Sequence, residues 1–170
     1  QQLEDAKTAY NRALEADPTC RAALRHLIRL ARREEDAQRL AELLVHRLEH
    51  IDADETGTHL ELARVFETQL TRPTESLSHY RAVLDGCGWH LGALKGAIRQ
   101  LRRLEGWRDL ADLLVEMCGR APSDAEAARL LNEIARLAEG PLDDPELAAD
   151  AYRRALSIPD VRRNEWAQMG

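Results

Sequence analysis

The chain repeats itself at a nearly constant interval throughout its 170 residues. One position, usually occupied by a small residue, recurs in steps of 35, 35, 35 and 37 residues at Ala6, Ala41, Ser76, Ala111 and Ala148. A second series, 13 residues from the first within each repeat, consists of Ile28, Ala63, Ile98 and Ala135. Such a period is typical of stacked structural units and argues against one globular core. We expect the two additional residues in the Gly119–Ser123 loop, whose composition favours a turn.

A longer duplication overlies this period. The segment ALRHLIRLARREEDAQRLAELLV, which begins at Ala23, aligns without gaps with ALKGAIRQLRRLEGWRDLADLLV, which begins 70 residues later at Ala93. ELARVFETQL from Glu61 likewise matches EIARLAEGPL from Glu133, at an offset of 72 residues. Residues at equivalent positions of the two copies can therefore be compared directly.

Each repeat is predicted to be a pair of helices. Leu40, Leu43, Leu44 and Leu48 have the spacing of an apolar helical face. β-branched residues are scarce, so a sheet is not supported. The pattern predicts helices at 2–16, 20–33, 36–50, 56–70, 74–86, 89–104, 107–118, 123–139 and 144–157, with another beginning near 161. Side chains that can accept backbone N–H bonds at helix starts are Asp36, Ser123 and Asp143.

The residues at these positions resemble a known repeat family. Ala6, Tyr10, Ala13 and Pro18 have the spacing of the second helix and trailing proline of a tetratricopeptide repeat (TPR). Further copies of this pattern are Ala148–Tyr152–Ala155 and Ser76–Tyr80–Val83. The resemblance, to a 35-residue variant, implies an all-α fold: an α-solenoid, a right-handed superhelix of stacked antiparallel helix-turn-helix repeats. Pentatricopeptide repeats share this period, but their polar base-reading pattern is not in register.

The resemblance covers essentially the whole chain. We expect a single TPR-like solenoid over 1–170, consisting of a half repeat at 1–18, full repeats at 19–53, 54–88, 89–125 and 126–160, and a truncated helix at 161–170. Neither end has the polar cap of a terminal repeat, which indicates a segment of a longer array. The apolar faces at its ends are expected to fray or to associate end to end.

Composition narrows the compartment and the class of partner. The net charge of -6 argues against a general nucleic-acid binder. No apolar run has the length of a membrane span, and no signal peptide is visible. Three cysteines without a tight pairing motif favour a reducing, cytoplasmic compartment, or a periplasmic one if a signal lies outside the segment. Arginine outnumbers lysine by 22 to 2, a bias that favours a bacterial source.

The sequence offers little for catalysis or metal binding. His46 and His50 have a metal-chelating spacing but lack a third ligand in register, so solvated histidines are the preferred interpretation. Cys87 and His90 could form half a metal site or a reactive pair, although a helix-ending loop is favoured. Cys118 and Trp107 are interpreted as packing residues. With no phosphate loop or nucleophile motif, we predict no enzymatic activity, no cofactor, no metal and no small-molecule substrate.

Basic residues form the more informative pattern. An arginine follows each member of the second small-residue series, at Arg29, Arg64, Arg99 and Arg136. The duplicated helices, which lack acidic residues, add Arg25, Arg32, Lys95 and Arg102. The TPR resemblance places the first helices on a concave groove, so these residues would dock an acidic peptide or protein surface. Alternatively, Arg32 and Arg102 form ion pairs with Glu67 and Glu139 on adjacent first helices and do not bind a partner.

The partner-binding prediction therefore comprises Arg25, Arg29, Arg32, Arg64, Lys95, Arg99, Arg102 and Arg136. The predicted function is a non-enzymatic protein–protein interaction scaffold. Two alternatives stay open: an RNA- or polyanion-binding helical-repeat protein, and a purely architectural spacer in a larger assembly.

Overall fold

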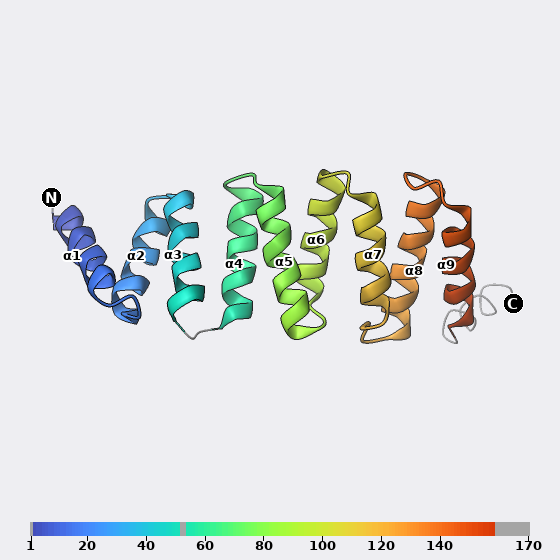
Figure 1. Ribbon diagram of the computed structural model, residues 1–170, viewed down its shortest axis with the longest axis horizontal. Coiled ribbons are helices and arrows are strands. Elements are labelled where there is room, and N and C mark those ends of the chain that lie inside the picture. The colour runs from blue at the N-terminus through green and yellow to red at the C-terminus, as the bar shows by residue number, and fades with distance from the viewer. Residues whose placement is uncertain (1, 52–53, 159–170) are drawn as a thin grey trace, which may run out of the picture. The chain divides into compact units, whose positions relative to one another are not determined.

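The computed structural model describes residues 2–51 and 54–158, and all regular secondary structure within them is α-helical (Figure 1). The helices are α1 (Gln2–Ala16), α2 (Arg21–Arg33), α3 (Ala37–His50), α4 (Glu55–Thr68), α5 (Pro73–Cys87), α6 (Leu91–Arg103), α7 (Trp107–Cys118), α8 (Asp124–Glu139) and α9 (Pro145–Ser157). The all-α prediction is confirmed, and each of these helices begins and ends within two residues of its predicted bounds. The helix predicted near 161 lies outside the described residues.

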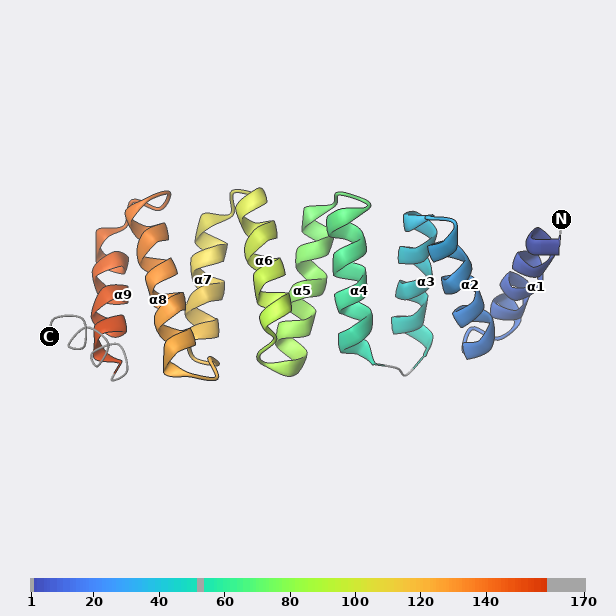
Figure 2. The same cartoon turned by 180° about the vertical axis from the view of Figure 1, so that it is seen from behind.

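The chain divides into two compact units, Gln1–Cys87 and Gly88–Gly170. The first contains α1–α5 and the second contains α6–α9. Within each unit, consecutive helices run antiparallel and pack against their neighbours, as both views show (Figures 1 and 2). The repeat boundaries and the right-handed sense of the superhelix stay predictions.

The small-residue series mark where helices pack closely. Ala63 on α4 and Ser76 on α5 are both fully buried, and the Ser76 hydroxyl donates a hydrogen bond to the Ala63 carbonyl at 2.8 Å. Other buried members of the two series are Ile28, Ala41, Ala111, Ala135 and Ala148. A short side chain lets two helix backbones approach, and the 13-residue separation places one such side chain on each helix of the α4–α5 pair.

The 70-residue duplication extends to the backbone of the turns. Glu35 after α2 and Glu105 after α6 both adopt positive φ, at 57° and 54°. At each turn the Glu N–H donates to a carbonyl three residues earlier, and the next residue's N–H donates to one five residues earlier. This is the Schellman arrangement of a helix C-terminus, which satisfies carbonyls that the helix leaves unpaired. Both α2–α3 and α6–α7 are therefore closed in the same way.

Helix capping agrees with the sequence at two of the three predicted positions. Asp36 accepts a hydrogen bond from the Arg39 N–H, and Ser123 accepts one from the Glu126 N–H. The prediction that Asp143 caps a helix is wrong. This residue lies in the turn before α9 and has a φ of 48°. The neighbouring Asp144 caps α9 instead and accepts from the Leu147 N–H at 3.0 Å.

Candidate functional site: an arginine-lined pocket

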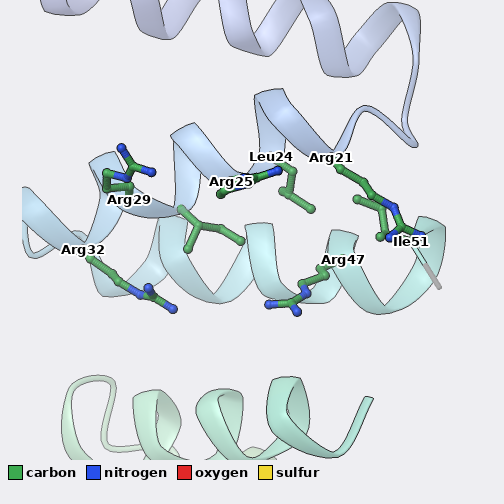
Figure 3. A pocket seen from close by; sticks show the side chains of 8 residues that line it. Arg21, Leu24, Arg25, Arg29, Arg32, Arg47 and Ile51 are labelled. Atoms are coloured by element: carbon green, nitrogen blue, oxygen red, sulfur yellow. The ribbon is translucent and has the colours of Figure 1, made fainter. Parts of the chain in front are cut away.

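A pocket of about 390 Å³ opens in the first unit along α2 and α3 (Figure 3). Its lining residues are Arg21, Leu24, Arg25, Ile28, Arg29 and Arg32 of α2, Arg47 of α3, and Ile51. The α2 arginines follow one another at spacings of four, four and three residues, which places them on one side of the helix. Leu24, Ile28 and Ile51 are buried and form the apolar floor.

The pocket has few carboxylates to balance its charge. Arg32 forms an ion pair with Glu61 of α4, in which Nε and Nη2 both donate to the same carboxylate oxygen. Arg25, Arg29 and Arg47 form no ion pair with any residue that the structure describes. Pairing inside the unit therefore neutralises only part of the positive charge that lines this pocket.

The structure adds Arg21 and Arg47 to the predicted cationic residues. Arg21 lies one turn before Arg25, so continuing the arginine spacing backwards would have found it. Arg47 belongs to α3 and its equivalent in the duplicate is Met117, so no repeat signal marked it. It reaches the pocket because α2 and α3 pack as a hairpin (Figure 3).

The second unit presents a less basic version of this surface. Lys95, Arg99 and Arg102 are exposed on α6, and Arg102 forms an ion pair with Glu133 of α8. The equivalent of Arg21 is Leu91, which is 44% exposed, whereas the equivalent of Arg47 is the fully buried Met117. The two units therefore share a helical framework but differ in the charge they display on it.

The ion pairs of Arg32 and Arg102 correct one detail of the sequence interpretation. Ion pairing was expected, but the partners are Glu61 and Glu133 rather than Glu67 and Glu139. Glu67 accepts a hydrogen bond from the Tyr80 hydroxyl at 2.6 Å. Glu139 accepts one from the Tyr152 hydroxyl at 3.0 Å. In both cases the recurring tyrosine of the repeat donates a hydrogen bond to the carboxylate that we had predicted to pair with an arginine.

The remaining members of the predicted arginine series lie on α4 and α8. Arg64 and Arg136 are exposed and form no ion pair with a described residue. Arg136 lies near Tyr152: the hydrogen bond to Glu139 raises the pKa of Tyr152, and the charge of Arg136 opposes that rise. The prediction that Arg29, Arg64, Arg99 and Arg136 form one ladder stays a prediction.

The histidines and cysteines have local structural roles. His46 is partly buried at the surface, and its Nε2 lies 2.9 Å from the Pro18 carbonyl. His90 caps α6 by accepting from the Ala93 N–H, and the Cys87 thiol donates to the Val83 carbonyl. Burial raises the pKa of Cys118. Within the described part of the chain, no group of three or more His, Cys, Asp or Glu residues is arranged to hold a metal.

A pair of histidines in the first unit was not anticipated. The Nδ1 atoms of His59 on α4 and His79 on α5 lie 2.9 Å apart, and the His79 ring stacks on Phe66. Burial, reinforced by the charge of His59, lowers the pKa of His79 to about 4. The His79 ring is therefore neutral at pH 7, and this contact is a packing element of the α4–α5 pair.

The described residues thus form helical hairpins of the α-helical repeat class. No family model matches the sequence, and no curated protein matches it either. Among solved structures, the fold is similar to that of YrrB, a TPR protein with an unusual peptide-binding site. The TM-score is 0.53 at 15% sequence identity, over 94% of this chain and 79% of that one. The likeness supports the TPR-like fold. Within the described residues, no helix has the length and apolar character that crossing a membrane requires.

Proposed function

We propose that this chain is a non-enzymatic interaction scaffold that docks an acidic peptide or protein segment on its arginine-bearing helices. The observation that carries the proposal is the α2–α3 pocket, in which five of the eight lining residues are arginines. The proposed docking residues include all those predicted from the sequence, which are Arg25, Arg29, Arg32, Arg64, Lys95, Arg99, Arg102 and Arg136. Arg21 and Arg47 are added to them because they line the pocket.

The chemistry of the side chains favours an acidic partner. A guanidinium group presents a planar fork of donors that holds a carboxylate through two parallel hydrogen bonds. Arg25 and Arg29 are exposed and have no described carboxylate partner, so their donors are accessible to a ligand. Since the chain carries a net charge of -6, this positive surface is a local feature rather than an average property. The likeness to a TPR protein that has a peptide-binding site is consistent with docking of a peptide.

Charge reversal separates a docking role from a structural one. We would change Arg29 and Arg99 together to Glu, and measure the binding of a fluorescein-labelled acidic peptide by anisotropy. The matched control changes Arg33 and Arg103 to Glu, because both are exposed on the same helices and contribute no side chain to the pocket. Loss of at least about tenfold in affinity is expected for the first variant alone, the effect of one charge-assisted hydrogen bond.

Thermal unfolding of the same variants completes the test. A docking surface predicts that Arg29→Glu/Arg99→Glu loses affinity while it remains folded, whereas a structural role predicts a fall in stability with affinity lost only as the fold is lost. Unaltered peptide binding by the stably folded double variant would refute the assignment of these residues.

The same assay addresses the two alternative functions. Basic helices of a repeat protein can also bind a nucleic-acid backbone, which makes a single-stranded RNA oligonucleotide the necessary comparison ligand. Tighter binding of the oligonucleotide than of the acidic peptide, with a steeper dependence on salt, would favour the RNA-binding alternative. An architectural spacer would bind neither ligand.

A further inference from the structure

We propose that the α2–α3 pocket recognises a phosphorylated side chain within the partner segment, so that docking depends on phosphorylation of the partner. The pocket is defined by Arg21, Arg25, Arg29, Arg32 and Arg47 around its apolar floor. This inference rests on the proposed docking function and adds the chemical class of the group that the pocket accepts.

The balance of charge in the pocket matches a dianion. Glu61 neutralises Arg32, while Arg25, Arg29 and Arg47 have no acidic partner among the described residues. A single carboxylate would compensate one of these three charges. A phosphoryl group carries a charge of about -1.5 to -2 at pH 7 and three strong acceptor oxygens, so it compensates more of them and can bridge several forks.

The floor of the pocket strengthens such an interaction. Leu24, Ile28 and Ile51 are 2%, 7% and 8% exposed, so they provide a low-dielectric surface with little apolar area left to cover. Attraction between charges increases as the local dielectric falls. The lining arginines come from both helices, Arg47 from α3 and the other four from α2 (Figure 3). The pocket is therefore better suited to a compact anion than to a large apolar side chain.

Comparison with the duplicate indicates that this chemistry belongs to the first unit. Leu91 and Met117 replace Arg21 and Arg47, and Lys95 replaces Arg25. Lysine provides a compact charge instead of a planar fork. The same helical framework is therefore built in the second unit without these three guanidinium groups.

Three labelled peptides of identical sequence test the proposal on the full chain. Each has aspartates around a central position, which is serine, phosphoserine or glutamate, and binding is measured by fluorescence anisotropy. We expect the phosphoserine peptide to bind at least about tenfold more tightly than the glutamate peptide, the effect of one additional charge-assisted hydrogen bond.

Matched variants show whether the pocket produces this discrimination. Arg25→Met combined with Arg47→Met should reduce the affinity for the phosphoserine peptide to that for the serine peptide. Arg12→Met combined with Arg33→Met makes the same change in charge at positions outside the pocket and should preserve the discrimination. Thermal unfolding confirms that both variants are folded.

The outcomes separate this inference from the docking function. Equal affinity for the phosphoserine and glutamate peptides would overturn the inference while leaving acidic docking intact, and binding of no peptide would refute both. Discrimination that survives the loss of Arg25 and Arg47 would also overturn it. So would tighter binding of a single-stranded oligonucleotide, or displacement of the peptide by an equal concentration of inorganic phosphate.

Discussion

Enlarging the side chain of Ala63 tests the close packing between α4 and α5. Ala63 is fully buried, and its carbonyl accepts the hydrogen bond from the buried Ser76 hydroxyl at 2.8 Å. Changing Ala63 to Leu adds three carbon atoms where the two helices approach. The helices must separate or the side chain must leave its preferred rotamer, which costs about 1–3 kcal/mol. Separation also breaks the Ser76 hydrogen bond, which contributes about 1 kcal/mol.

We therefore expect Ala63→Leu to lower the free energy of unfolding by about 2–4 kcal/mol, measured by urea denaturation followed by circular dichroism. Ala22→Leu is the control, because Ala22 is exposed on α2 and the same enlargement there meets solvent. Ser76→Ala measures the hydrogen bond alone and should cost about 1 kcal/mol. A loss of stability in Ala63→Leu no greater than that in Ala22→Leu would contradict close packing of the helices at Ala63.

Three further measurements address individual side chains. Gln100 is buried, and its Oε1 has no hydrogen-bond partner. The equivalent residue of the first copy is Leu30, and we expect Gln100→Leu to stabilise the protein by about 1 kcal/mol in urea denaturation; destabilisation would contradict this. Because burial lowers the pKa of His79 from 6.5 to about 4, the unfolded chain binds more protons between these values and stability falls as pH decreases through them. Relative to His79→Gln, the wild-type chain should lose about 1 kcal/mol between pH 7.5 and pH 5, after allowance for solvent screening; identical pH profiles would exclude this role. Arg32→Met should lower the free energy of unfolding by no more than about 1 kcal/mol, because the ion pair with Glu61 is partly exposed. A larger loss of stability in thermal unfolding would show that this ion pair is essential to the packing of α2 and α4.

The helical elements could be predicted from local sequence. The leucine spacing indicated the helices, and Asp36 and Ser123 marked two of their starts, because the 3.6-residue period and helix capping depend on neighbouring residues. Asp143 failed as a cap because Asp144 is adjacent and equally suited, so residue type alone did not distinguish the turn from the helix start.

The charged surface was only partly predictable. The sequence identified Arg25, Arg29 and Arg32 as exposed cations on one helix, since their spacing is a property of that helix. It did not identify Arg47, because a residue of α3 reaches the pocket only through the packing of α3 on α2. The His59–His79 contact likewise joins two helices and left no pattern in the sequence.

The sequence by itself therefore determined the all-α class, the 35-residue unit and the exposed arginines, since each follows from periodicity along one chain segment. Tertiary structure alone decided the partners of those arginines. Glu61 and Glu133 pair with Arg32 and Arg102. The carboxylates of Glu67 and Glu139, which the sequence had suggested as partners, accept hydrogen bonds from Tyr80 and Tyr152. An ion pair between helices depends on how they are rotated and spaced relative to each other, and packing of their buried faces sets both.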